Sequence, residues 1–340
     1  MKAEFSEEAK QMKTVDVIIP TYKPGKKFIR QQRMLQKQTY PINRIIIVNT
    51  EAEFLDRSLV EDYANVSVRD ISSSEFDHGA TRNLGVSLST ADYFLLMTDD
   101  AIPKDEKLVE HLVNMMEGGE SGTGSLEKES AYSCGNPIPG EKKKCEIAAV
   151  YGRQLATEES SDDEKYSRSF NYPEISFVKT IEDLPRLGIK TYFESNVCCL
   201  YRRDVFEKLK GFPNRTIFNE DMIYCCKMLK AGYASAYCAE AEVLHAHNYN
   251  GIQQLRRNFD LGVSQADNPD VFGGIRSEGE GIKLVKGNAL SLLKKGRIFS
   301  TVRLIYVSLC KYIGYRLGKN YKRLSRKTIM KLTMNKHYWE

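Results

Sequence analysis

The 340-residue sequence has only one Trp, five His and ten Pro, and it contains no collagen-like period. With 41% hydrophobic and 28% charged residues it is typical of a globular chain, which excludes disorder and fibrous structure. No CxxC spacing occurs among the eight cysteines, four of which form the pairs Cys198-Cys199 and Cys225-Cys226 in apolar surroundings. This placement argues against a disulfide framework or a zinc knuckle and predicts reduced cysteines in the core.

A long apolar run is also missing. The most apolar stretch, from Ile298 to Cys310, is interrupted by Arg303 and is too short to cross a bilayer. Residues 1–13 are charged and have no apolar centre, so we expect an N-terminal extension and not a signal peptide. These features predict a cytoplasmic location.

Acidic residues are absent from residues 281–339, which contain fifteen Lys or Arg. With Glu340 this tail carries +14, and because the whole chain carries +5, the first 280 residues carry about −9. A basic amphipathic tail of this kind binds anionic membranes, acidic partners or nucleic acid, or packs on the acidic body. No recognisable nucleic-acid-binding module is present, so we do not expect nucleic acid as a partner.

Apolar β-branched runs alternate with helical periods in the first half of the chain. The expected strands are residues 15–20, 44–48, 66–69 and 93–97, and the expected helices are residues 28–38, 55–63 and 79–89. This alternation predicts an α/β fold, with a mostly parallel sheet and helices on both faces. Ligands bind beyond the carboxyl ends of such strands, which directs attention to Thr21-Tyr22, Asn49-Thr50-Glu51 and Thr98-Asp99-Asp100.

Changes in composition predict the domain organisation. The α/β domain occupies residues 14–250, and a basic helical C-terminal region occupies residues 251–340. Within the first domain, residues 117–146 are rich in Gly, Ser, Glu and Lys, and we expect a mobile insertion there, either a lid or an inert loop.

Three groups of residues point to metal and acid–base chemistry. Asp99 and Asp100 follow an apolar strand, where paired carboxylates either bind Mg²⁺ or Mn²⁺ or cap the next helix. Glu220 and Asp221 begin a helix, where they supply a general base or complement the helix dipole. His245 and His247 share one face of an extended segment, a spacing that suits metal ligands as well as structural histidines.

A fourth motif, Asp77-His78-Gly79-Ala80-Thr81-Arg82-Asn83-Leu84-Gly85, places Arg82 near a helix N-terminus. The sequence also has a first strand that ends Ile-Pro-Thr-Tyr, the "TDDA" aspartates, the "ED" pair and the late histidines. Taken together and in this order, these segments resemble the inverting family-two glycosyltransferases of GT-A fold. The segments "FDHGATRNLG", "YGRQLA", "SFNYP", "SNVCCLYRRDVF" and "HAHNY" resemble the bacterial rhamnosyltransferase-like branch of surface polysaccharide synthesis. The resemblance covers residues 15–249.

The resemblance implies roles for these residues. Asp221 would be the catalytic base with Glu220 as its acidic neighbour, and Asp100 with His245 or His247 would bind Mg²⁺ or Mn²⁺. The nucleotide-sugar donor would contact Pro20, Thr21, Tyr22, Asn49, Glu51, Arg82 and Asp99. Many members have an Asp after the second strand to pair with a pyrimidine, whereas here Asn49 and Glu51 are the acceptors available.

The resemblance therefore implies an inverting, metal-dependent transfer of a sugar from a nucleotide-diphosphate donor, with dTDP-rhamnose as one candidate. The acceptor would be a hydroxyl of a growing, lipid-linked cell-surface polysaccharide. Such an acceptor favours peripheral attachment to the inner face of the cell membrane, through an anionic surface contacted by residues 281–339. Two alternatives remain open at this point: a nucleotidylyltransferase acting on sugar phosphates, and a non-catalytic polysaccharide- or membrane-associated module.

Overall fold

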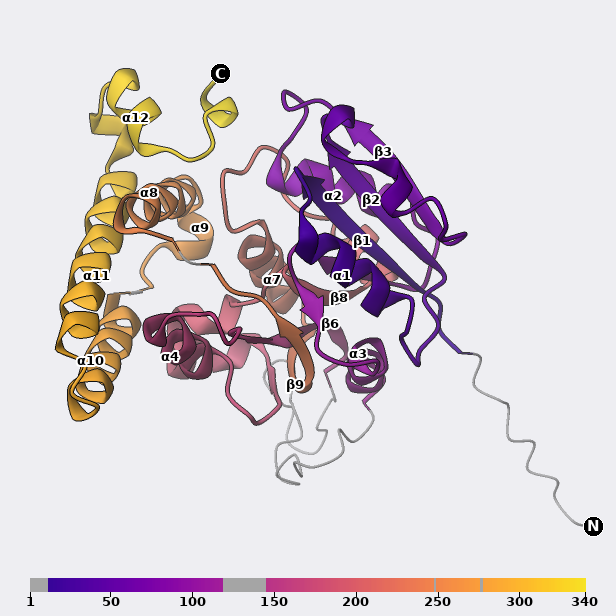
Figure 1. Cartoon of the computed structure of the whole chain (residues 1–340), viewed down its shortest axis with the longest axis horizontal. Helices are drawn as coiled ribbons and strands as arrows, with labels where there is room; N and C mark the ends of the chain where they lie inside the picture. Colours follow the sequence, from indigo (N-terminus) through magenta and orange to yellow (C-terminus); the bar gives the residue numbers. More distant parts are fainter. Residues whose placement is uncertain (1–11, 119–144, 248, 276–277) are drawn as a thin grey trace, which may run out of the picture.

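The computed structural model describes residues 12–118, 145–247, 249–275 and 278–340, and most of the expected insertion at 117–146 therefore lies outside the described residues (Figure 1). Its centre is a nine-stranded sheet in the order β3-β2-β1-β4-β8-β6-β9-β5, with β7 also paired to β9. The strands are β1 (Val15–Tyr22), β2 (Arg44–Thr50), β3 (Val66–Ile71), β4 (Tyr93–Met97), β5 (Ile102–Pro103), β6 (Ile147–Leu155), β7 (Phe177–Lys179), β8 (Cys198–Arg202) and β9 (Ala234–Leu244).

The strands β3, β2, β1 and β4 run parallel to one another, and β6 runs parallel to β9, whereas β5, β7 and β8 pair antiparallel with their neighbours. Register aligns the carboxyl ends: Tyr22 lies opposite Thr50, and Thr50 lies opposite Ile71. After β3 the chain crosses to the other side of β1 to form β4. That switch point, where ligands bind in such sheets, lies at the carboxyl ends of β1 and β4.

Helices cover both faces of this sheet, which confirms the predicted α/β fold. The α-helices are α1 (Lys26–Leu35), α2 (His78–Ser87), α3 (Leu108–Met116), α4 (Asp162–Asn171), α5 (Leu184–Leu187), α6 (Arg203–Lys208), α7 (Glu220–Lys230), α8 (Gly251–Asp267), α9 (Pro269–Phe272), α10 (Glu278–Lys294), α11 (Ile298–Lys319) and α12 (Arg326–Leu332). Alternate residues of β1 face opposite cores: Val17 and Ile19 pack with α1 and α3, and Ile18 packs with α2, α6 and α7.

One expected helix is wrong. Residues 55–63 do not form a continuous helix; the segment contains the short 3-10 turn Arg57–Leu59, and a similar turn, Ala52–Phe54, precedes it. Leu55 and Val60 are nonetheless buried in the core. The Asp56 side chain accepts a hydrogen bond from the Ser58 backbone N–H at 3.1 Å, a local contact that favours a turn.

The C-terminal helices form a layer beside the sheet domain (Figure 1). Close contact between α8 and α11 depends on glycine: a Cβ atom on Gly314 would lie 2.0 Å from the Leu255 carbonyl oxygen. Ile217, just before α7, packs with Phe259 of α8 and Ile329 of α12, which joins this layer to the sheet domain. Among the helices that the structure describes, none is both long and apolar enough to cross a membrane.

The prediction of reduced cysteines in the core holds for five of the seven cysteines that the structure describes, and Cys134 lies outside the described residues. Cys198, Cys199, Cys225, Cys226 and Cys238 are buried free thiols, and Cys310 is a partly exposed free thiol. Cys145 is disulfide-bonded, so the expectation of reduced cysteines throughout was wrong at this position.

Candidate active site

A cavity of about 750 Å³ opens at the carboxyl ends of β1 and β4. Its lining joins eight of the sequence-predicted residues: Tyr22, Arg82, Asp99, Asp100, Glu220, Asp221, His245 and His247. They come from the end of β1, from the residues just after β4 and β9, from α2 and from the first turn of α7. The topology therefore brings together five segments that are far apart in the sequence.

Asp100, His245 and His247 form a group of potential metal ligands whose donor atoms all lie within 4.8 Å of one another. Asp100 Oδ1 lies 3.4 Å from His245 Nε2, and its Oδ2 lies 3.7 Å from His247 Nδ1. Burial lowers the pKa of His245 and lowers that of His247 to about 4, so both imidazoles are neutral at physiological pH. Neutral imidazole and carboxylate are the states that bind a divalent ion.

Gln154 fixes which nitrogen of His245 faces Asp100. Its Oε1 lies 2.9 Å from His245 Nδ1 and also accepts from Arg168, while its Nε2 donates to Ser195 Oγ at 2.8 Å. A carbonyl oxygen only accepts, which assigns the ring proton to Nδ1 and turns the bare Nε2 toward Asp100. The lone pairs of His245 Nε2 and Asp100 Oδ1 then face each other at 3.4 Å, and a cation between these two atoms would relieve their repulsion. The residues present therefore fit a divalent cation.

Glu220 and Asp221 are positioned by the residue before them. Asn219 takes a left-handed conformation with φ of 63°, and its side-chain amide donates to Ser264 Oγ of α8 at 3.1 Å. Helix α7 starts at Glu220, so its first two side chains project from the turn into the cavity lining. Asn196, just before β8, donates from its amide to Glu220 Oε1 at 3.0 Å and from its backbone to Asp221 Oδ2 at 3.4 Å.

The two carboxyl groups have different charge environments. Burial favours the neutral form of Glu220, but the Arg82 guanidinium, 3.3 Å from Oε1, together with His78 and the hydrogen bond from Asn196, holds the pKa of Glu220 below its usual range. Burial and the neighbouring Glu220 charge raise the pKa of Asp221 to about 7. A carboxylate of raised pKa close to neutrality is suited to accept a proton from a hydroxyl group.

The predicted nucleotide contacts divide into two sets. Tyr22 lines the cavity, as does Asp99, whose pKa is raised to about 6 by burial and by Asp100. The described lining of this cavity does not include Pro20, Thr21, Asn49 or Glu51.

Asn49 and Glu51 are instead held by neighbouring polar groups. The fully buried Asn49 accepts from Thr21 Oγ1 at 3.1 Å and donates to Asp70 Oδ1 at 2.8 Å. Glu51 accepts from the Ser73 backbone N–H at 2.5 Å. These bonds hold the side chains of Asn49 and Glu51 beside the cavity, and their contact with the nucleotide stays a prediction.

Several site residues escaped the sequence prediction. Asn196, Gln154 and Arg168 orient the predicted groups, and Lys27 and Arg257 add positive charge to the cavity. Gln154 lies in the "YGRQLA" segment and Asn196 begins "NVCCLYRRDVF", so the motifs contained them, but their roles depend on contacts between distant strands. Arg257 lies on α8, in the basic C-terminal region, where nothing in the sequence pattern points to the site.

The fold is of the GT-A type. The mannosyltransferase PcManGT from Pyrobaculum calidifontis, solved in complex with GDP-Man and Mn²⁺, superposes with a TM-score of 0.57 at 13% identity, covering 93% of this chain and 89% of that chain. Residues 16–125 match Glycosyl transferase family 2. The O-antigen chain rhamnosyltransferase RfbN of Salmonella typhimurium is 37% identical over 329 residues, and WbaN of Salmonella anatum, of the same description, is 35% identical over 333; each alignment covers 96% of both chains.

The chain belongs to glycosyltransferase family 2, as the sequence motifs indicated. It is a glycosyltransferase, and this membership favours sugar transfer over the nucleotidylyltransferase and non-catalytic alternatives.

Proposed function

We propose that this glycosyltransferase transfers a rhamnosyl residue from a nucleoside-diphosphate donor such as dTDP-rhamnose to a hydroxyl group of a growing, lipid-linked O-antigen-type polysaccharide, with inversion at the anomeric carbon. The names of the two relatives support the sugar and the acceptor class. The single structural observation that carries the proposal is the placement of Asp221 and the Asp100, His245 and His247 group in the lining of one cavity.

A neighbouring cavity of about 380 Å³ also has Asp221 in its lining and extends between α4 and α8, past Arg168 and Asn258. Asp221 therefore faces two compartments. We assign the cavity of about 750 Å³ to the donor and the cavity of about 380 Å³ to the acceptor sugar, and call them the donor and the acceptor cavity. In this proposal residues 14–250 form the catalytic unit, and residues 251–340 complete both compartments.

Asp100, His245 and His247 would hold Mg²⁺ or Mn²⁺, which would neutralise the diphosphate and make it a better leaving group. Lys27 and Arg257 add positive charge on the same side of the cavity. Asp221 accepts the proton of the acceptor hydroxyl while that oxygen forms a bond to the anomeric carbon. The bond from this carbon to the diphosphate oxygen breaks in the same displacement, which inverts the configuration without an enzyme nucleophile.

A thermal-shift screen tests this proposal. We expect UDP, dTDP or GDP to raise the melting temperature in the presence of Mn²⁺, with a smaller rise when the metal is chelated, because bound ligand stabilises the folded state. The corresponding nucleotide sugar should then be consumed slowly by hydrolysis. If no nucleoside diphosphate stabilises the protein in a metal-dependent manner, the proposed donor class is wrong.

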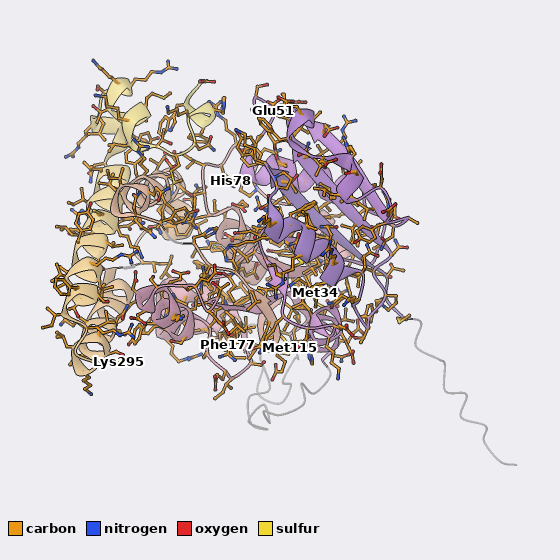
Figure 2. All side chains as sticks on the ribbon, in the orientation of Figure 1. Met34, Glu51, His78, Met115, Phe177 and Lys295 are labelled. Carbon is orange, nitrogen blue, oxygen red and sulfur yellow. The ribbon has the colours of Figure 1, made fainter. Side chains whose placement is uncertain are left out.

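Membrane attachment forms part of the proposal and is supported by α11. Its outward face exposes Phe299, Val302, Tyr306, Leu309 and Ile313, spaced three and four residues apart, while Thr301, Leu304 and Val307 are buried. Phe299 is 92% exposed. Lys294 and Lys295, at the end of α10 and in the turn between α10 and α11, are also exposed, and Figure 2 labels Lys295. An apolar stripe beside cations suits the surface of an anionic bilayer.

The double substitution Phe299→Ser and Leu309→Ser is expected to weaken binding to vesicles rich in phosphatidylglycerol by about tenfold or more, because each side chain would otherwise bury apolar area in the bilayer. Co-sedimentation with the vesicles measures the effect. Ile175→Ser, at a side chain 72% exposed on another part of the molecule, is the matched control and should not change binding. Equal sedimentation of the double variant and the unmodified protein would reject the attachment.

A further inference from the structure

A second cavity of about 450 Å³ adjoins the donor cavity and shares Tyr22, His78, Phe218 and Arg257 with it. Tyr22, Thr50 and Ser73, which line it, come from the ends of β1 and β2 and from the turn after β3. These three segments are adjacent in the sheet, so the cavity continues the donor site along the carboxyl edge. Its described lining does not include Asp221, which places it away from the proton-accepting group.

The opposite wall is the C-terminal segment Met334, Asn335, Lys336 and His337. This segment returns from α12 toward the sheet (Figure 1), and Figure 2 labels Glu51 and His78 at the edge that it faces. The sequence prediction favoured an anionic membrane surface as the partner of residues 281–339, with packing on the acidic body as the alternative, and gave these residues no part in the site.

The C-terminal segment is fixed to α8 by a buried carboxylate. Asp260 is 3% exposed and accepts from Thr333 Oγ1 at 2.6 Å and from the Met334 backbone N–H at 2.8 Å. Beyond the segment, Tyr338 and Trp339 pack against the group that contains Phe259 and Ile329. Because both ends are anchored, Lys336 and His337 lie on a structured part of the wall, and both side chains are exposed.

The chemistry of the lining matches a nucleoside. Tyr22, Phe76 and Phe218 offer aromatic rings, and Thr50, Ser73 and Asn335 add polar groups. A largely apolar cavity with a few polar groups, in the size range of about 300–1,000 Å³, is typical of a small-molecule site. Arg257 lines both this cavity and the donor cavity, which contains Asp100, so the two cavities are continuous around one cationic side chain.

We propose that this second cavity binds the nucleoside part of the donor, and that Lys336 and His337 of the C-terminal segment contact its base or ribose. The inference rests on the proposed function, since it extends the same donor site. It assigns part of donor recognition to the last residues of the chain, outside the segment that matches the family. From the second cavity to the acceptor cavity, the order of the subsites is then nucleoside, diphosphate, sugar and acceptor.

Isothermal titration of the full chain with UDP, dTDP and GDP in the presence of Mn²⁺ tests the inference. The double substitution Lys336→Ala and His337→Ala is expected to raise the dissociation constant of the bound nucleoside diphosphate by about tenfold. Inorganic pyrophosphate, which has no nucleoside, should bind the variant and the unmodified protein equally. Lys331→Ala, an exposed lysine on α12, removes a similar charge away from the cavity and should leave both affinities unchanged.

The outcomes separate the two levels of the proposal. Weaker nucleoside-diphosphate binding with unchanged pyrophosphate binding supports the nucleoside assignment. An equal loss of affinity for the nucleoside diphosphate and for pyrophosphate would show a general effect of charge and would overturn the nucleoside assignment. Unchanged affinity for both ligands would also overturn it. If the unmodified protein binds none of the three nucleoside diphosphates, the proposed function itself fails.

Discussion

Asp221→Asn is expected to lower the rate of sugar transfer about a thousandfold while leaving nucleoside-diphosphate binding unchanged, because asparagine keeps the shape of the side chain but cannot accept the hydroxyl proton. The Arg82–Glu220 ion pair should survive because it does not involve Asp221, and the oxygen that asparagine keeps can still accept from the Met222 backbone N–H. The measurements are the transfer rate at saturating donor and the affinity for the nucleoside diphosphate. Transfer within tenfold of the normal rate would show that another group is the base.

Asp62→Asn provides the matched control, because this exposed aspartate is not part of the lining of the donor or acceptor cavity and undergoes the same chemical change. It should leave both measurements unchanged. A parallel loss in Asp62→Asn and Asp221→Asn would indicate a general effect of the substitution and would remove the support for Asp221.

The pH profile of transfer provides a second readout of the same assignment. Because Asp221 must be ionised to act as a base and its pKa is raised to about 7, the rate should rise with pH through neutrality and then level off. Glu220→Gln removes a negative neighbour and releases Arg82, and both changes favour the ionised form of Asp221. The midpoint of the profile should therefore move to lower pH in Glu220→Gln, whatever the change in maximal rate.

Asp100→Asn is expected to weaken Mn²⁺-dependent binding of the nucleoside diphosphate at least tenfold and to lower transfer about a thousandfold, because one charged oxygen ligand of the His245 and His247 group is lost. Binding measured with the metal chelated should not change. Titration with and without Mn²⁺ checks both parts. Unaltered metal dependence in Asp100→Asn would remove this residue from the proposed ligand set.

The sequence predicted the sheet domain well because its signals are local. Runs such as residues 44–48 and 93–97 are long, β-branched or apolar, and they became β2 and β4. The apolar spacing of Leu55 and Val60 led to the wrong prediction of a helix, because both side chains reach the core from turns. The spacing of apolar residues predicts which side chains are buried, but it does not determine which backbone conformation places them in the core.

The candidate site was predictable where its residues carry their own chemistry. The carboxylates and histidines stand out by type and spacing, and the sheet topology brings them together. Gln154 and Asn196 act by orienting those groups across strands, and their types alone are not informative. The C-terminal wall could not be anticipated, since it depends on a contact between Asp260 and residues more than seventy positions later.

Asn49 and Glu51 are predicted nucleotide contacts whose role stays a prediction. They lie at the end of β2 and just after it, where many family members have a base-pairing Asp, and here their side chains are engaged by Thr21, Asp70 and Ser73. The neighbouring cavity, lined by Thr50 and the C-terminal segment, is the site that we propose for the nucleoside.

The stereochemistry of donor turnover tests the central claim most directly. The unmodified protein, incubated with Mn²⁺ and the nucleotide sugar that stabilises it, should release sugar whose first-formed anomer is inverted relative to the donor, as observed by NMR before mutarotation. This result is expected from one displacement with Asp221 as the base and no covalent sugar–enzyme intermediate. Release with retained configuration, or turnover that proceeds equally without metal, would contradict the account.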